Sequence, residues 1–174
     1  MLKSLLFFAK YLLFWLLYFA VDRFVFMFIF HIKLRDIPLS DKIATYYHAL
    51  RLDISMAAYI AVIPLLAYTF WYFTNREKIN FRWVKIYNIV LILLFSLIST
   101  INFNVYREWG SKINSRVIEF AILTPGESLA SSASSPLLLS LLVYVVLASV
   151  GLYLNFILVK QYITFVKTPI WVKT

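Results

Sequence analysis

Charged side chains that could bind a phosphate gather in the stretch from Asn102 to Ser135. This stretch carries three basic and three acidic residues and lies between two long apolar runs. Arginine suits phosphate because its guanidinium presents a planar fork of N–H donors to the phosphate oxygens. With one arginine from an earlier part of the chain, the stretch supplies a candidate phosphate-binding set: Arg51, Arg107, Lys112 and Arg116.

A second charged feature is the adjacent pair Asp22 and Arg23, which interrupts the first apolar run. Charged side chains within a membrane span usually face the interior of the helix bundle and are paired. Two interpretations stay open. The two residues form an intramembrane ion pair that fixes helix packing, or they contact a substrate directly.

The sequence contains no signature of a catalytic or metal centre. It has no Walker loop, GxGxxG, HExxH or GxSxG motif. Without cysteine it can form neither a disulfide nor a thiol nucleophile. Its two histidines, His31 and His48, are fewer ligands than a metal site needs. We therefore predict no catalytic residue, no metal site and no cofactor in this chain.

The composition is that of a membrane protein. Of the 174 residues 63% are hydrophobic and 14% are charged, whereas a soluble domain is about half apolar and about a quarter charged. A spanning helix needs about 20 mostly apolar residues. We predict an all-α, polytopic membrane helix bundle with about four transmembrane helices, at about 4–31, 52–74, 86–103 and 136–159.

Short amphipathic helices are predicted at the membrane surface, mainly in an outer loop at about 104–135. Apolar residues recur at helical spacing between Ile113 and Ala121, and Thr124 to Glu127 has the form of a helix start. Ser40 and Asp41 start another helix, which runs into the second span. The helices of the outer loop either cover the bundle, or their basic residues cradle a lipid phosphate.

Two further features concern helix packing. Pro64 should kink the second span, because it removes one backbone donor and clashes with the preceding turn. Ala148, Ser149 and Gly151 form a small-residue patch that would let a neighbouring helix approach closely.

The net charge of +9 is distributed in loops and at span ends. This pattern indicates contact with anionic lipid and not with nucleic acid. With the N-terminus in the cytoplasm, nine basic residues lie on the cytoplasmic side and seven on the outer side. The excess favours a cytoplasmic N-terminus, and four spans would return the C-terminus to the same side.

Two segments resemble the membrane-anchored sulfatase-like enzymes of the lipoteichoic acid synthase and phosphoglycerol transferase group, in the alkaline phosphatase superfamily. Residues 48–68, HALRLDISMAAYIAVIPLLAY, are similar to the second span of these enzymes. Residues 105–132, VYREWGSKINSRVIEFAILTPGESLASS, are similar to the outer loop after their third span. Arg23 also matches an arginine of that family. The resemblance covers nearly the whole chain, and the RLD and YREWG strings carry most of it.

The resemblance implies a bundle of five spans in a bacterial inner (cytoplasmic) membrane, followed by an extracytoplasmic domain. In that domain a threonine nucleophile and a divalent metal transfer a phospholipid headgroup to an envelope acceptor. This chain departs from the pattern in two ways. It stops at Thr174, so we expect the fifth span and the catalytic domain to be absent, and Asn102 stands where the family pattern has an aspartate.

The resemblance thus implies a membrane-anchor and lipid-positioning domain of a sulfatase-like phosphotransferase that moves phosphoglycerol or phosphoethanolamine. Asp53 and Tyr106 then join the candidate set for headgroup binding, and membrane phospholipids and other envelope proteins are the expected partners. Two alternatives remain open. The chain is a non-catalytic membrane subunit or anchor of a larger envelope complex, or it is a transport-complex subunit with Asp22 and Arg23 as a buried relay.

Overall fold

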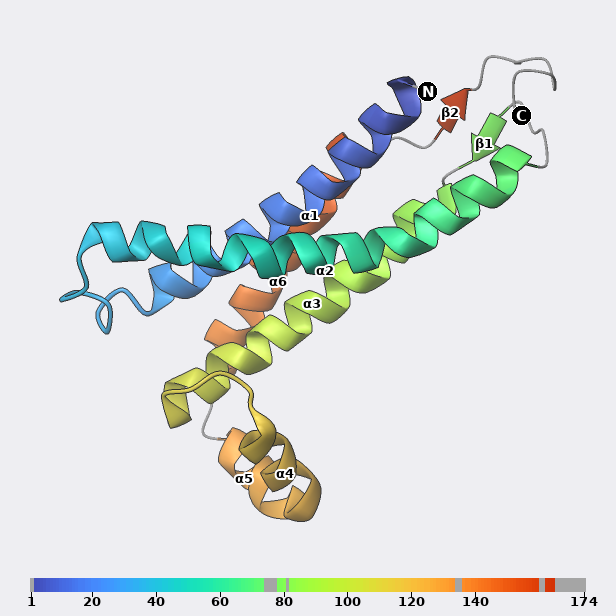
Figure 1. The fold of residues 1–174 in the computed structure, drawn as a ribbon. Coiled ribbons are helices and arrows are strands. Elements are labelled where there is room, and N and C mark those ends of the chain that lie inside the picture. Colours follow the sequence, from blue (N-terminus) through green and yellow to red (C-terminus); the bar gives the residue numbers. More distant parts are fainter. Residues whose placement is uncertain (1, 74–77, 81, 134–135, 160–161, 165–174) are drawn as a thin grey trace.

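The computed structural model describes residues 2–73, 78–80, 82–133, 136–159 and 162–164. In chain order the elements are α1 (Leu2–Ile29), α2 (Leu39–Phe73), β1 (Lys78–Asn80), α3 (Arg82–Trp109), α4 (Ser115–Leu123), α5 (Pro125–Ala133), α6 (Leu137–Leu158) and β2 (Tyr162–Thr164) (Figure 1). The four helices α1, α2, α3 and α6 are long and apolar enough to cross a membrane. The predicted all-α polytopic bundle is confirmed, and the chain is a multi-pass membrane protein.

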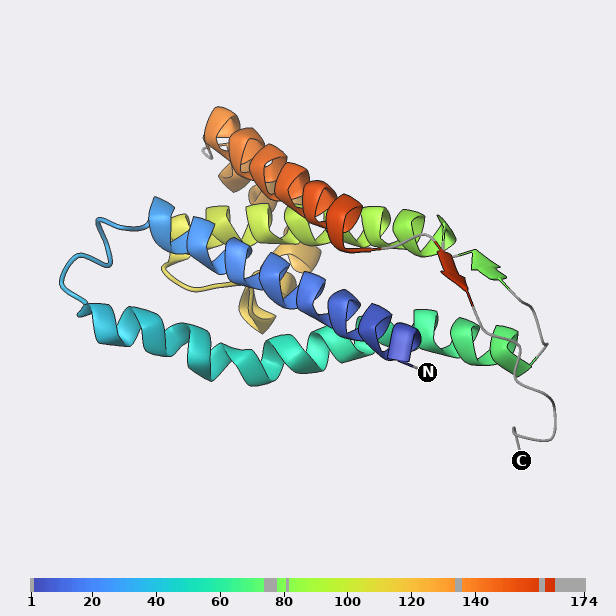
Figure 2. The same cartoon turned by 90° about the horizontal axis from the view of Figure 1, so that it is seen from above.

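Helix α1 is the centre of the bundle. The main helix contacts are α3 with α6, α1 with α2, and α1 with α6. Figure 2 shows α2 set apart from α3 and α6 along much of its length. Near its C-terminal half α2 approaches α3, where the Tyr87 hydroxyl donates a hydrogen bond to the carbonyl oxygen of Ile60 over 3.4 Å. The N-terminal end of α2 projects beyond the other helices (Figure 1).

Large aromatic side chains of α1 fill the space between the helices. Tyr11, Phe14, Trp15 and Tyr18 are almost completely buried, and Ile92 of α3 packs with them. The outward faces of all four long helices carry exposed leucine, isoleucine and valine side chains. Since lipid tails are as apolar as these side chains, close packing and hydrogen bonds must hold the helices together.

Buried polar side chains supply such bonds between α1, α3 and α6. The Tyr11 hydroxyl donates to Oδ1 of Asn88 over 2.7 Å, and Nδ2 of Asn88 donates to Oδ1 of Asn155 over 3.1 Å. Two helical turns further along α1, the Tyr18 hydroxyl lies 2.8 Å from the Ser96 hydroxyl. Because the bilayer core offers no water to unpaired polar groups, these bonds specify how the three helices align.

Two helices extend beyond the predicted spans. The helix expected at the membrane surface and the second span form one continuous helix, α2, which passes through the buried Pro64 and bends along its course (Figure 1). Helix α3 continues past the expected end of the third span to Trp109. It stops at Gly110, whose φ of 68° is the left-handed conformation that ends many helices.

The two helices of the outer loop lie beside the end of α3 (Figure 1). Asn114 caps α4, because its Oδ1 accepts a hydrogen bond from the Val117 amide over 3.1 Å. The ring of Phe120 faces Trp109 at 5.5 Å between centroids. Ile122, in contrast, is exposed. Helix α4 is therefore amphipathic, as predicted, although its far side is also partly apolar.

A short strand pair was not predicted. β1 and β2 pair antiparallel with Ile79 opposite Ile163, so the connection between α2 and α3 meets the chain that follows α6. Strands of three residues are too short to show the alternation of apolar and polar residues from which a strand is predicted. Four basic residues of the predicted cytoplasmic side lie outside the described residues: Arg76, Lys160, Lys167 and Lys173.

The small-residue patch of α6 leads to the first prediction. A Cβ atom at Gly151 would lie 2.6 Å from Cγ2 of Ile92 and 2.8 Å from Cε2 of Tyr18. We expect Gly151→Ala to lower the free energy of unfolding by ~1–3 kcal/mol through overpacking, measured by thermal unfolding in detergent. Gly126→Ala is the matched control, because no atom lies within 4 Å of its added Cβ. An unchanged or higher unfolding temperature for Gly151→Ala would contradict the packing described.

Candidate functional site

A cavity of about 570 Å³ lies between α1, α2 and α3 and is partly open to the outside of the bundle. Helices α2 and α3 meet near Ile60 and Tyr87. The cavity lies between these two helices on the side of that contact that is nearer the outer loop, and residues of α1 form its floor. Apolar and aromatic side chains form most of its wall. Its polar groups come from all three helices and the outer loop: Tyr18, Asp22, Asp53, Ser55, Tyr59, Ser99, Asn102 and Lys112.

An ion pair between α1 and α2 lies at one edge of this cavity. The Arg23 guanidinium donates two hydrogen bonds to the Asp53 carboxylate, over 2.9 and 3.2 Å. The two side chains are only 19% and 15% exposed. The guanidinium also lies 5.7 Å from the ring centroid of Tyr46. This bidentate geometry is the strongest form of an arginine–carboxylate contact.

The predicted pairing of Asp22 with Arg23 is therefore wrong. Successive residues of a helix point about 100° apart, so the two side chains leave α1 in different directions. Arg23 reaches α2, whereas Asp22 lines the cavity near Ser99 of α3. Within the part of the chain that the structure describes, Asp22 forms no direct ion pair. The basic residue that lines the same cavity as Asp22 is Lys112.

The segment between α3 and α4 positions Lys112 at the cavity. Oδ1 of Asn102 accepts a hydrogen bond from the Ile113 amide over 3.0 Å, which ties this segment to α3. Nζ of Lys112 lies 4.8 Å from the ring centroid of Phe26 on α1. An asparagine stands here where the family pattern has an aspartate, and its amide oxygen still accepts this hydrogen bond.

Tyr106 and Arg107 lie on the last turns of α3 but do not line this cavity. The Tyr106 ring packs against Phe26 and Phe30 at centroid distances of 4.9 and 4.7 Å. Nζ of Lys33 lies 5.4 Å from the Tyr106 centroid. The Arg107 guanidinium forms an ion pair with the neighbouring Glu108 over 2.6 Å. Tyr106 thus belongs to an aromatic cluster beside the site.

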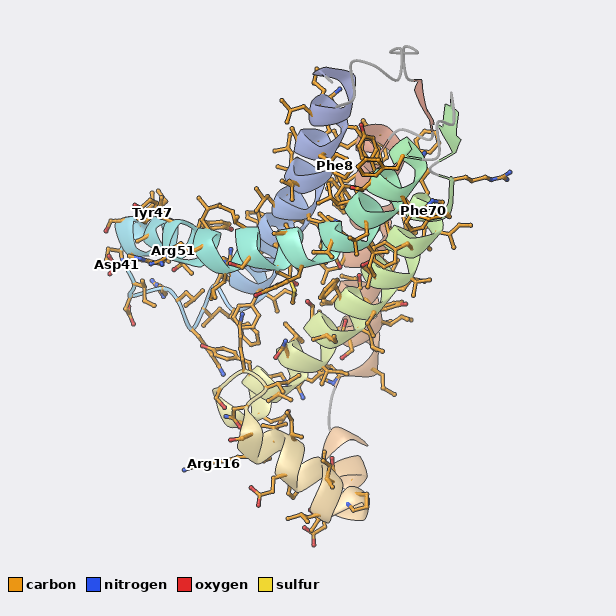
Figure 3. All side chains as sticks on the ribbon, turned by 45° about the vertical axis from the view of Figure 1, so that its right-hand side comes forward. Phe8, Asp41, Tyr47, Arg51, Phe70 and Arg116 are labelled. Carbon is orange, nitrogen blue, oxygen red and sulfur yellow. The ribbon has the colours of Figure 1, made fainter. Side chains whose placement is uncertain are left out.

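Arg51 and Arg116 are exposed and lie far apart (Figure 3). Arg51 lies toward the N-terminal end of α2, and Arg116 points outward from α4. Of the residues predicted to bind a headgroup, only Asp53 and Lys112 line the cavity, and Asp22 joins them. The arrangement does not bring the four predicted basic side chains together around one ligand.

Sequence reasoning did not identify Tyr18, Ser99 and Asn102 as parts of a site. A signal for two of them was present, because Ser99 and Asn102 are polar residues three apart at the end of an apolar run. Polar side chains in a span usually face other helices. Tyr18 gave no such signal, since tyrosine is common throughout this chain.

The histidines lie apart from the cavity. Nδ1 of His31 is 2.8 Å from the Phe28 carbonyl oxygen, and the His48 ring packs beside Tyr47. Among the residues that the structure describes, no three His, Cys, Asp or Glu side chains are grouped as metal ligands would be.

No protein-family model, curated protein sequence or solved structure matches this chain. The resemblance to sulfatase-like phosphotransferases therefore depends on the sequence segments quoted above.

The ion pair leads to the second prediction. Arg23→Met or Asp53→Asn leaves one partner partly buried without its counter-charge. We expect each single variant to lower the free energy of unfolding. The decrease should lie between the ~1 kcal/mol that an exposed ion pair contributes and the ~3–5 kcal/mol lost when a fully buried pair is broken. The double variant Arg23→Met/Asp53→Asn should lose less stability than the sum of the two single losses. Unfolding in detergent measures these differences, with the exposed Arg116→Met as control. Additive losses would exclude a direct interaction.

Proposed function

We propose that this chain is the membrane-anchor and lipid-positioning domain of a sulfatase-like phosphotransferase, and that it holds a phospholipid in the cavity between α1, α2 and α3. The enzyme would move a phospholipid headgroup onto an envelope acceptor. Its setting is a bacterial inner membrane, with the N-terminus in the cytoplasm. The chemistry itself would belong to an extracytoplasmic catalytic domain of the enzyme.

The cavity is the observation that carries the proposal. Small-molecule sites usually have volumes of about 300–1,000 Å³, with a mostly apolar wall and a few convergent polar groups. At about 570 Å³, this cavity combines an apolar wall with polar groups from three helices and the outer loop. A phospholipid needs the same combination, because its acyl chains are apolar and its headgroup is charged.

Different residues of the cavity would contact the headgroup and the acyl chains of the lipid. The Lys112 ammonium can neutralise a headgroup phosphate at the outer-loop side of the cavity, and the Ser99 hydroxyl can donate a hydrogen bond. Exposed apolar residues of the same helices, such as Met56 and Ile98, would contact the acyl chains. Arg51 and Arg116 would contribute only general attraction to anionic lipid, because they are exposed and distant from each other.

Filling the cavity tests this function. Ser55 is exposed on the cavity wall, so Ser55→Trp should occupy the space without disturbing the core. We expect lipid affinity to fall about tenfold, which corresponds to ~1.4 kcal/mol. Native mass spectrometry with synthetic phospholipids measures the affinity. Ile54→Trp is the matched control, because Ile54 is also exposed on α2 but does not line the cavity. Equal affinities for the two variants would end the proposal.

The proposed orientation has its own test. The chain has no cysteine, so a single cysteine at Ser111 reports one position only. We expect a membrane-impermeant maleimide to label this cysteine on intact cells, because the Trp109 region faces the outside. Labelling that occurs only after the cells are broken open would mean the inverse topology. Lipid would then be presented to the cytoplasmic leaflet.

One observation favours a second candidate, a non-catalytic subunit of an envelope complex. The N-terminal end of α2 exposes Ile43 and Tyr47, at 61% and 75%, and a partner helix could cover them. The genomic reading frame discriminates between the two candidates. A continuation of several hundred residues past Thr174 supports the phosphotransferase, and a stop codon supports the subunit.

A further inference from the structure

The charges around the cavity are only partly paired by direct contacts in the described part of the chain. Two carboxylates line it, those of Asp22 and Asp53. The Asp53 carboxylate is neutralised by Arg23 through two hydrogen bonds. Asp22 has no such contact in the described part of the chain. An ionised carboxylate held away from water is costly unless an opposite charge or hydrogen-bond donors approach it.

The polar groups of α1, α3 and the outer loop leave this carboxylate only partly satisfied. Ser99 of α3 lines the cavity with it, and Asn102 already accepts a hydrogen bond from the Ile113 amide. The Tyr18 hydroxyl is shared with Ser96 and the Ile92 carbonyl. Lys112 lines the same cavity, and within the described residues no direct ion pair joins it to this carboxylate. A space bounded by one negative and one positive group therefore remains.

A zwitterionic headgroup with a terminal ammonium matches this space. Its ammonium has three N–H donors, which can bond to the Asp22 carboxylate and the Ser99 hydroxyl oxygen. Its phosphate can then face Lys112. A phosphoglycerol headgroup would satisfy Lys112 equally, but it would bring no positive charge to Asp22. A trimethylated ammonium would bring the charge without any N–H donor.

We infer that the cavity selects a phospholipid whose headgroup ends in a primary ammonium group, with Asp22 as the partner of the ammonium and Lys112 as the partner of the phosphate. This inference rests on the proposed function, because it names the class of lipid that the same cavity holds.

The test compares three synthetic lipids with identical acyl chains: phosphatidylethanolamine, phosphatidylglycerol and phosphatidylcholine. Binding to the purified full chain is measured by native mass spectrometry. We expect the wild-type chain to bind phosphatidylethanolamine about tenfold more tightly than either other lipid, roughly what one charge-assisted contact contributes. Asp22→Asn should abolish this preference and leave phosphatidylglycerol binding unchanged or stronger. Asp41→Asn, which removes an exposed acid of α2 outside the cavity, should change nothing.

A second variant covers the case in which Asp22→Asn does not fold. Ser99→Ala removes one acceptor for the ammonium without changing any charge, and it should reduce the preference for phosphatidylethanolamine several-fold. If the wild-type chain binds all three lipids equally, or prefers phosphatidylglycerol, the inference is overturned and the proposed function stands. If it binds none of them, or if Ser55→Trp binds them as tightly as Ile54→Trp, the proposed function fails as well.

Discussion

The attachment of α2 to α1 by the Arg23–Asp53 ion pair is the contact on which the site depends. Helix α2 has its main contact with α1, and the Tyr87 hydroxyl of α3 donates a hydrogen bond to its Ile60 carbonyl oxygen. In a bilayer, apolar side chains gain little by exchanging lipid for another helix. A bidentate ion pair between partly buried side chains therefore has a large share in fixing the position of α2.

That position leaves the cavity between α2 and α3. The bundle beneath it is held by hydrogen bonds among Tyr11, Asn88 and Asn155 and by the close approach of Gly151 to α1 and α3. These contacts join α1, α3 and α6 but not α2. The structure thus consists of a tightly specified group of three helices and a fourth helix attached along one side, and the cavity lies along the less tightly packed side.

The spans were predictable because the requirement for about 20 apolar residues is a local property of the sequence. The residues that each side chain contacts on other helices were not predictable in this way. Asp22 and Arg23 are neighbours in the chain, yet the helical rotation sends Arg23 to α2 and Asp22 into the cavity. Asp53 was predicted as a headgroup ligand, and its partner lies 30 residues earlier on another helix. Such pairings depend on how helices pack, which the hydropathy of each helix does not encode.

Asn102 shows how a single residue at the cavity connects position and charge. Its amide oxygen accepts the bond from the Ile113 amide that holds the Lys112 segment against α3. The aspartate of the family pattern would accept the same bond, so the position of the segment does not require the amide. The aspartate would, however, add a third carboxylate beside those of Asp22 and Asp53. Lys112 would then face two unpaired acids in place of one. The amide therefore maintains a balance of one free acid and one free base in the cavity, which is the balance that the proposed zwitterionic headgroup would complement.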